Sequence, residues 1–255
     1  DSLHSLLHEA ALLLRDWVGC EAVGVRLREG LDFPYFVTDG FPADFVEAEM
    51  HLCAGQYDDR PARDATGRPI LECMCGNVIA GRFDANQPFF TQNGSFWTNS
   101  TTDLLAWTPL DVRPSQAESR CHAEGYESVA LIPLRHGDQA LGLLQINDRQ
   151  RDRFTCQTIA VLERLTASLA LAVAQRQNAR ALQASQELLN ATQRLSKTGG
   201  WEYDLGTQTM VWTEETERIH DHTLSGDVHT MSELGALSAS CYDPENRKTV
   251  LERFW

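Results

Sequence analysis

The sequence predicts an α+β fold made of two units joined by a long helix, and three features support this prediction. Residues 128–148 ("SVALIPLRHGDQALGLLQIND") contain two apolar segments that meet at Gly137-Asp138, the pattern of a β-hairpin. Residues 154–195 contain neither glycine nor proline and are rich in helix-forming side chains. Gly199-Gly200 then ends the helix and begins a segment of different composition. A chain of 255 residues is also long enough for two separate cores.

The first fifty residues predict a helix, a strand pair and a shorter helix. Residues 2–18 have the amphipathic pattern of a helix. Residues 22–27 ("AVGVRL") alternate like a strand, and residues 33–40 ("FPYFVTDG") follow as its hairpin partner. Pro42 suits the first turn of a helix over residues 42–50.

The next part of the chain is irregular. Residues 53–69 are rich in Asp, Arg and Gly, which predicts a long loop, and loops of this length often serve a site. Residues 82–98 carry many aromatic side chains but have no helical or strand period. Either Asn99 or Ser100 can begin the next helix, because both residue types cap helices well. Both segments of the 128–148 hairpin are apolar enough to lie in the centre of a sheet.

The long helix has two parts with different patterns. In the first part, apolar residues such as Ile159 and Leu162 form the stripe of a helix packed on a sheet. In the second part, apolar and small residues recur in steps of three and four, which is the seam pattern of a coiled coil. This pattern predicts a weak coiled coil and a homodimer through residues 171–195. The alternative is that this part is a solvated linker helix. The seam positions are Leu171, Ala174, Asn178, Ala181, Ser185, Leu188, Thr192 and Leu195.

The last part of the chain predicts a second, smaller α+β unit. Residues 201–205 ("WEYDL") and 209–213 ("TMVWT") read as two short strands joined by a turn. Helices are expected over residues 214–220 and 244–255. Because two strands are too few for an independently stable sheet, we expect residues 198–255 to be an incomplete unit.

Composition excludes several classes of partner. The formal net charge of −14 argues against nucleic acid, which is bound through clustered Lys and Arg. The N-terminus lacks the pattern of a signal peptide. The most apolar run, residues 165–174, is shorter than the roughly 20 residues that a membrane span needs. We therefore expect a cytoplasmic protein without a membrane span.

The spacing of the cysteines predicts a metal site. Cys73 and Cys75 stand one residue apart in "LECMCGNV", and in an extended segment both side chains would leave the same side of the backbone. Cys53 and Cys121 also fall in irregular segments that can converge on this pair. Four thiolates suit a tetrahedral Zn²⁺ ion or an iron–sulfur cluster. The predicted metal ligands are Cys53, Cys73, Cys75 and Cys121.

Other interpretations of the cysteines remain open. Buried cysteines often act as small hydrophobic residues, which is our expectation for Cys20, Cys156 and Cys241. A Cys-x-Cys pair can also work without metal, as a strained disulfide or a sulfenic acid that a second thiol resolves. His51 and His122 lie close in sequence to predicted ligands and can replace a cysteine as ligand; the alternative is that both are exposed polar residues.

Aromatic and polar side chains predict a ligand pocket. The predicted lining residues are Phe89, Phe90, Phe96, Trp97, Asn99 and Thr101. Arg120, Glu124 and Glu127 can orient a ligand or support the metal ligands from behind. The competing interpretation places the aromatic residues in the core and the charged residues on an exposed helix. No phosphate-binding loop, dinucleotide fingerprint, zinc-protease motif or hydrolase elbow is present in the sequence.

Several segments of the chain resemble the GAF domains of bacterial signalling proteins. They are the surroundings of Cys53 and residues 71–78, 95–102 ("SFWTNSTT") and 120–135 ("RCHAEGYESVALIPLR"). The resemblance implies a central antiparallel sheet with helices on one face and a ligand pocket on the other.

The resemblance also implies a division of the chain. Residues 1–175 resemble the GAF domain, and residues 198–255 are similar to the first part of a PAS domain through "GGWEYDL" and "MVWTEETERIHD". Residues 176–197 then form a helical linker.

The function implied is that of a cytosolic sensory input module, in a sensor histidine kinase or a similar protein, that responds to an unknown small molecule or to redox state. We expect the kinase or cyclase output module to lie outside this sequence. One alternative is a thiol enzyme, because free-methionine sulfoxide reductases are GAF domains with cysteines near the pocket. A structural interaction module without a ligand is another.

Overall fold

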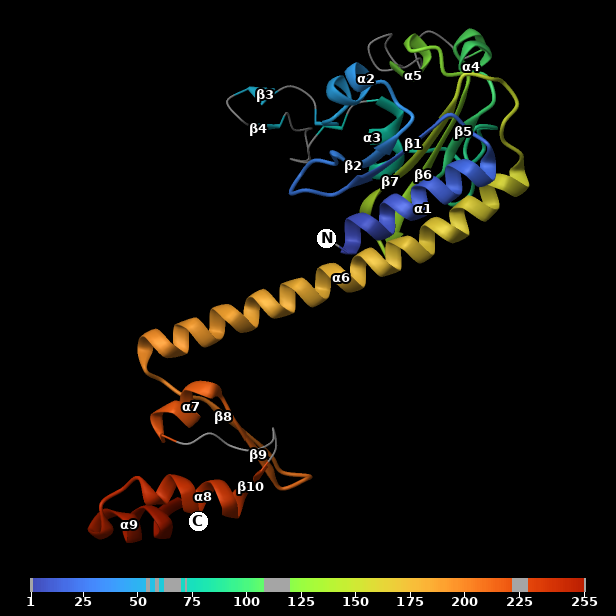
Figure 1. The fold of residues 1–255 in the computed structure, drawn as a ribbon. Helices are drawn as coiled ribbons and strands as arrows, with labels where there is room; N and C mark the ends of the chain where they lie inside the picture. Colours follow the sequence, from blue (N-terminus) through green and yellow to red (C-terminus); the bar gives the residue numbers. More distant parts are fainter. Residues whose placement is uncertain are drawn as a thin grey trace. The chain divides into compact units, whose positions relative to one another are not determined.

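The first unit of the protein is built around one antiparallel sheet. The computed structural model describes residues 2–53, 56–57, 60–61, 70–71, 73–107, 120–221 and 229–254, and the chain divides into two compact units, Asp1–Gln177 and Asn178–Trp255. Five strands of the first unit pair in the order β2-β1-β7-β6-β5 (Figure 1). Their bounds are Ala22–Leu27 (β1), Tyr35–Asp39 (β2), Phe96–Thr98 (β5), Ser128–His136 (β6) and Gln139–Asp148 (β7), and a separate short pair is Gln56–Tyr57 (β3) with Arg60–Pro61 (β4).

Helices cover both faces of this sheet. The long helices α1 and α6 lie side by side on one face, and the short helices lie toward the other (Figure 1). The helix bounds are Ser2–Val18 (α1), Ala43–Ala48 (α2), Cys73–Ala80 (α3), Thr101–Trp107 (α4), Arg120–Ala123 (α5) and Cys156–Ser196 (α6). The antiparallel sheet with packed helices confirms the predicted α+β class.

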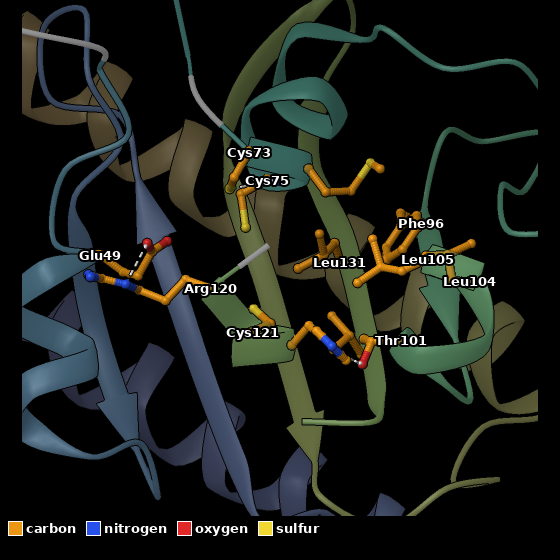
Figure 2. A pocket seen from close by; sticks show the side chains of 13 residues that line it. Glu49, Cys73, Cys75, Phe96, Thr101, Leu104, Leu105, Arg120, Cys121 and Leu131 are labelled. Carbon is orange, nitrogen blue, oxygen red and sulfur yellow. Dashed lines mark hydrogen bonds and ion pairs between the residues drawn. The ribbon is translucent and has the colours of Figure 1, made fainter. Parts of the chain in front are cut away.

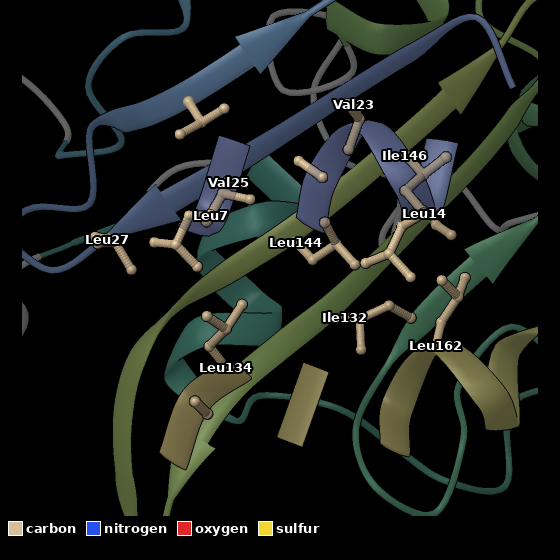
Figure 3. Close-up of a cluster of buried hydrophobic side chains, with 14 of the residues drawn as sticks. Leu7, Leu14, Val23, Val25, Leu27, Ile132, Leu134, Leu144, Ile146 and Leu162 are labelled. Atoms are coloured by element: carbon tan, nitrogen blue, oxygen red, sulfur yellow. The ribbon is translucent and has the colours of Figure 1, made fainter. Parts of the chain in front are cut away.

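Strand alternation separates two cores. Along β6, Ala130, Ile132 and Leu134 face the first core, whereas Val129 and Leu131 face the second. The first core is filled by α1, α6 and the covered sheet face (Figure 3). Burial of these apolar side chains is the main stabilising term, at about 25 cal/mol for each Å² removed from water.

The edge strand β5 is fastened to α6. Glu163 on α6 accepts hydrogen bonds from Thr91 Oγ1 at 2.5 Å and from Ser95 Oγ at 2.6 Å. Asn99, which was predicted for the pocket, instead exchanges two hydrogen bonds with the backbone of Phe154, at 2.8 and 2.9 Å. The polar residues around β5 therefore join this strand to the long helix.

Most elements predicted for the first unit are present, including the first helix, both hairpins with the second in the sheet centre, and the helix after Ser100. Two predictions are wrong. Residues 73–80 are a helix, not an extended segment, and the aromatic region contains the short strand β5. Three residues are too few to show a strand period, so β5 left no signal in the sequence.

The second unit has a small three-stranded sheet in the order β10-β9-β8. Its elements are Trp201–Asp204 (β8), Thr209–Trp212 (β9), Glu214–Ile219 (α7), His229–Thr230 (β10), Met231–Ser240 (α8) and Pro244–Phe254 (α9). The predicted strands and the helices α7 and α9 are confirmed, but the prediction of only two strands is wrong. β10 is two residues long, and α8 follows it directly.

Helix α6 is long and apolar enough, by length and composition alone, to cross a membrane. Core helices of soluble proteins pass the same test. In this structure Ile159, Leu162, Ala170 and Val173 of α6 are buried in the first core. Packing on the sheet thus uses one stripe of the apolar part of the helix, while Leu165 and Leu171 are exposed.

Candidate functional site

A pocket opens on the sheet face opposite α1 and α6. It lies between α3, α4 and α5 and has an empty volume of about 560 Å³, solvent at its open mouth included (Figure 2). Its apolar wall consists of Met74, Phe96, Leu104, Leu105, Val129 and Leu131. The remaining lining residues are Glu49, Cys73, Cys75, Thr101, Arg120, Cys121 and His122.

A row of paired residues runs across the sheet face that carries this pocket, and two of them, Leu131 and Phe96, line it. Gly24 of β1 pairs with Gln145 of β7, Gln145 pairs with Leu131 of β6, and Leu131 pairs with Phe96 of β5. Paired residues on neighbouring strands point to the same face, so all four share the pocket side. Gly24 is needed here because a Cβ would lie 2.8 Å from the ring of Tyr35, which crosses β1 to reach Gln145.

The buried amide of Gln145 holds two of the thiols. Its Oε1 accepts hydrogen bonds from the Tyr35 hydroxyl at 2.8 Å and from the Cys75 thiol at 3.8 Å. Its Nε2 donates to Cys121 Sγ and to Asn147 Oδ1, both at 3.4 Å. Both ends of the amide are occupied, as a buried polar group requires. Cys75 is therefore placed as a donor and Cys121 as an acceptor.

The third thiol caps helix α3. Cys73 begins the helix with a φ of 55°, a left-handed conformation that is uncommon for residues other than glycine. Its sulfur accepts a hydrogen bond from the backbone N–H of Cys75 at 3.3 Å. Gly76 lets the first turn of α3 pack closely against Leu71, because a Cβ at position 76 would lie 2.6 Å from Leu71 Cβ. The side chains of Cys73 and Cys75 are thus brought together by the cap of α3. The predicted alternation of side chains along a strand is not the cause.

The three thiols differ in acidity. The hydrogen bond from the Cys75 side chain lowers the pKa of Cys73 and outweighs the effect of burial. The same contact, together with burial, raises the pKa of Cys75 well above its ordinary value. Burial raises the pKa of Cys121 to about 12. The pocket therefore presents one sulfur that favours the thiolate beside two that stay protonated.

A buried arginine supports the loop beside the pocket. Arg26 is fully buried on the pocket face of β1, and its guanidinium lies 3.6 Å from the centroid of the Tyr35 ring. It donates hydrogen bonds to the carbonyl oxygens of Glu49 at 2.6 Å, Phe33 at 3.1 Å and Met50 at 3.2 Å. These bonds fix the backbone at residue 49, so that the Glu49 side chain reaches the pocket wall.

Polar side chains mark two positions on the wall. The Thr101 hydroxyl donates to the carbonyl oxygen of Tyr126 at 2.7 Å, so it accepts from His122 Nδ1 at 2.9 Å. This assignment leaves Nε2 of the neutral imidazole as a hydrogen-bond acceptor. Glu49 and Arg120, with 3.9 Å between Oε1 and Nε, form an ion pair elsewhere on the wall (Figure 2).

Cys53 is not among the residues that line the pocket. Its Sγ lies 3.5 Å from the carbonyl oxygen of Leu31, and its backbone N–H donates to Asp32 at 3.1 Å. Burial, with the charge of Asp32, raises the pKa of Cys53 to about 11. Of the four predicted metal ligands, the structure therefore gathers three in one pocket.

The donor atoms of the pocket are occupied with one another. Within the part of the chain that the structure describes, no group of three or more His, Cys, Asp or Glu side chains is arranged to hold a metal ion. Cys75 and Cys121 are both hydrogen-bonded to Gln145. As they stand, these thiols do not fit a metal centre, and the Zn²⁺ or iron–sulfur centre stays a prediction.

The predicted aromatic residues divide between the two cores. Phe96 and Thr101 line the pocket. Phe89 and Phe90 pack behind Phe96, with ring centroids at 5.9 and 5.8 Å from it. Trp97 packs against the first core, on the other side of β5.

Two of the charged residues predicted near the site serve the surrounding loops. Glu127 accepts hydrogen bonds from Ser100 Oγ at 2.9 Å and from Thr102 Oγ1 at 2.5 Å, which secures the start of α4. Glu124 lies 3.7 Å from Arg149 in an ion pair. Neither residue lines the pocket, so Arg120 is the one of the three that reaches it.

The remaining cysteines and histidine lie outside the pocket. Cys20 is buried as predicted, whereas Cys156 and Cys241 are exposed, so the prediction that they fill the core is wrong. Cys156 is the first residue of α6 and Cys241 follows the end of α8, and both lie at the surface. His51 is exposed and pairs with Asp32 at 2.7 Å.

Gln145 and Arg26 are site residues that we did not identify from the sequence. A signal for each was present. Gln145 interrupts an apolar run in a strand predicted to be central, and a buried amide must find hydrogen-bond partners. Arg26 stands in a strand whose other residues are apolar or glycine.

Comparison with known proteins identifies the first unit. No curated protein matches the sequence. Among solved structures, the chain is similar to a type II free methionine-R-sulfoxide reductase from Thermoplasma acidophilum (12% identity, 66% of this chain and 89% of that chain, TM-score 0.43). It is also similar to the GAF domain of a phosphoenolpyruvate-protein phosphotransferase from Coxiella burnetii (16% identity, 70% and 86%, TM-score 0.47). A third similar structure is the photoproduct state of GAF3 from Slr1393 of Synechocystis sp. PCC6803 (13% identity, 71% and 99%, TM-score 0.47).

The family model of the GAF domain matches residues 2–173, which is more than half of the chain. This match agrees with the antiparallel sheet, the helices α1 and α6 on one face and the pocket on the other. The resemblance noted in the sequence is thereby confirmed for the first unit, and the chain belongs to the GAF domain family.

Proposed function

We propose that residues 2–173 are a sensory input domain that binds a small molecule in the pocket and passes its presence to α6. GAF domains are typical of sensory signalling modules. The observation that carries the proposal is the pocket itself, which is open, mostly apolar and polar at only two places on its wall. Such concave apolar sites with few polar groups are typical of small-ligand binding.

The lining indicates the chemistry of the ligand. Its apolar wall favours a compact, mostly hydrophobic molecule. His122 Nε2 offers a hydrogen-bond acceptor, so a hydroxyl or N–H on the ligand is favoured at that position. The ion pair of Glu49 and Arg120 can contact a second polar group. We therefore propose a small ligand with one donor group on an apolar body.

A route for the signal runs through β5. Phe96 lines the pocket and belongs to β5, while Ser95, the residue before it, donates to Glu163 of α6. A ligand that shifts Phe96 would therefore act on α6 through this hydrogen bond. The response requires only two arrangements that differ by a few kcal/mol and that the ligand stabilises unequally.

The setting of this domain is part of the proposal. We propose that it serves a cytoplasmic sensor histidine kinase or a similar protein, as a homodimer joined through α6, with a kinase or cyclase as output. The second unit would then be the first part of a PAS domain. The three short strands and three helices in its described residues, up to 221 and from 229 to 254, are compatible with this assignment.

The binding proposal is tested by filling the pocket. A library of small hydroxylated and N–H-bearing aromatic and aliphatic compounds is screened by thermal shift, and hits are measured by calorimetry. Leu131→Phe should weaken binding at least roughly tenfold, because blocking the site costs more than about 1.4 kcal/mol. Leu165→Phe on the exposed face of α6 is the matched control. Equal affinity of the two variants for every hit would refute binding in this pocket.

Two other functions are tested on the same preparation. Elemental analysis and the absorption spectrum of anaerobically purified protein address the metal centre, because iron–sulfur clusters absorb visible light and zinc does not. A turnover assay with free methionine sulfoxide and a thiol reductant addresses the enzyme alternative. Both tests are independent of the ligand screen.

A further inference from the structure

We propose that Cys73 and Cys75 form a redox switch in the pocket wall, in which a hydroperoxide oxidises Cys73 to a sulfenic acid and Cys75 then closes a disulfide with it. The inference deepens the proposed sensory function and rests on it for the signalling consequence. The chemistry of the two thiols rests on their own geometry.

The placement of the two thiols is the first argument. Cys73 is half-buried and lines the open pocket, whereas Cys75 is only 2% exposed. The Cys73 sulfur accepts a hydrogen bond from the backbone N–H of Cys75 at 3.3 Å. Figure 2 shows them side by side at the start of α3, with Cys121 on α5. A small oxidant that enters the pocket therefore meets Cys73, with a second thiol in contact with it.

The chemical environment of Cys73 is the second argument. The hydrogen bond from the Cys75 backbone N–H stabilises a negative charge on the Cys73 sulfur, and the thiolate is the form that attacks an oxidant. The left-handed backbone of Cys73 is a strained conformation of the kind that gathers at functional sites. Opening this first turn, which disulfide formation requires, would relieve that strain.

The reaction is balanced with a hydroperoxide as the only co-substrate. The Cys73 thiolate attacks the terminal oxygen of R–O–OH, the O–O bond breaks, and the alkoxide leaves and takes a proton to become the alcohol, or water for hydrogen peroxide. The sulfur gains oxygen as S–OH. Cys75 then attacks the Cys73 sulfur, so that an S–S bond forms, the S–O bond breaks, and hydroxide leaves with the Cys75 proton as water. An external dithiol returns the pair to the reduced state by exchange.

The disulfide would change the hydrogen bonds of Gln145, which contacts Cys75 and Cys121 of the pocket wall. In the reduced state the Cys75 thiol donates to Gln145 Oε1, and the same amide donates to Cys121. Oxidation removes the Cys75 proton, so this contact is lost and the amide is free to reorient. Gln145 pairs with Leu131, which lines the pocket and pairs in turn with Phe96 of β5. Oxidation therefore acts on the same strand that we propose to report the ligand.

The test is mass mapping of the full chain after treatment with one equivalent of hydrogen peroxide. Tryptic cleavage separates residues 64–82, which contain Cys73 and Cys75, from the peptide of Cys121. We expect peptide 64–82 to lose two hydrogen atoms, and a dithiol reductant to restore them. Cys73 should react roughly tenfold or more faster than the exposed Cys241, because its sulfur accepts a hydrogen bond from the Cys75 backbone N–H and has a second thiol beside it.

Variants identify the role of each thiol. Cys75→Ser should leave a Cys73 sulfenic acid that dimedone traps, whereas Cys241→Ser, at an exposed cysteine outside the pocket, should form the disulfide like the wild type. A cross-link that contains Cys121, oxidation confined to Cys156 and Cys241, or no oxidation would each overturn the proposal. The peptide mass map of the wild-type protein tests the proposal even if a variant fails to fold. A disulfide that forms in a protein that binds no compound of the ligand screen would overturn the proposed ligand-binding function and leave the switch standing.

Discussion

At the scale of single residues, Arg26 shows how a buried charge can organise this fold. A guanidinium removed from water needs hydrogen-bond acceptors, and Arg26 donates from its two terminal nitrogens to three backbone carbonyl oxygens and lies over the face of Tyr35, while its buried Nε has no hydrogen-bond partner within the described part of the chain. No side chain of another type could reach the three carbonyls from β1, because only Arg carries a planar fork of five donors. The residue thus joins the sheet to the segment that carries Glu49.

We predict that Arg26→Met destabilises the first unit by about 3 kcal/mol. The variant keeps the apolar stem but leaves three carbonyl oxygens without their donor, and hydrogen bonds to charged groups contribute roughly 1.5–3 kcal/mol each before the cost of burying the charge. Urea unfolding followed by tryptophan fluorescence measures the change. Arg28→Met, on an exposed neighbour, should shift stability by less than about 0.5 kcal/mol. Equal effects of both substitutions would contradict the role given to Arg26.

At the scale of elements, the link between β5 and α6 is made by a single carboxylate. Glu163 accepts hydrogen bonds from Thr91, Asn93 and Ser95 at 2.5, 2.6 and 2.6 Å. These donors surround the turn that leads into β5, an edge strand with one partner in the sheet. Without this link the strand would depend on its three pairs with β6 and on the bridge between Phe96 and Phe90.

We predict that Glu163→Gln loosens β5 and costs about 1–3 kcal/mol of local stability. The amide keeps the shape of the carboxylate but has one accepting oxygen, and its NH₂ group faces a donor. Hydrogen exchange of the backbone amides of residues 91–98 should therefore become faster. Glu187→Gln, farther along α6 and exposed, should leave this exchange unchanged. Unaltered protection in the Glu163 variant would show that β5 is held by the sheet alone.

The elements that the sequence predicted are those whose signal is local. The hairpin of β6 and β7 carries its own alternation and turn, and α6 carries its own helical pattern. Helix α3 was missed because its eight residues include Gly76 and begin at a strained Cys73, so packing against Leu71 and the sheet decides its conformation. For the site, the convergence of Cys73, Cys75 and Cys121 could be anticipated from residue type. The position of Cys53 could not, because the spacing of residues along a loop does not fix where the loop packs.

At the scale of the whole molecule, α6 changes its surroundings along its length. Ala174 is 6% exposed and belongs to the first core, whereas Leu171 is 46% exposed, so of these two seam positions only Ala174 is used within the domain. Farther along, Leu188 and Leu195 are 69% and 88% exposed. A helix with exposed leucines at heptad spacing gains stability when a second helix covers them. The dimer contact through residues 171–195 stays a prediction, and Leu171, Leu188 and Leu195 are the exposed leucines of its seam.

We predict that Leu188→Glu combined with Leu195→Glu weakens self-association of the full chain at least roughly a hundredfold, because burying each leucine contributes about 1.5–3 kcal/mol and like charges would then face each other. Sedimentation equilibrium at micromolar concentrations measures the change. Gln186→Glu adds charge to the outer side of the same helix and should leave the dimer intact. If the double variant dimerises as tightly as the wild type, the contact lies outside α6. A ligand or redox signal that reaches α6 would then have to leave the domain by another surface.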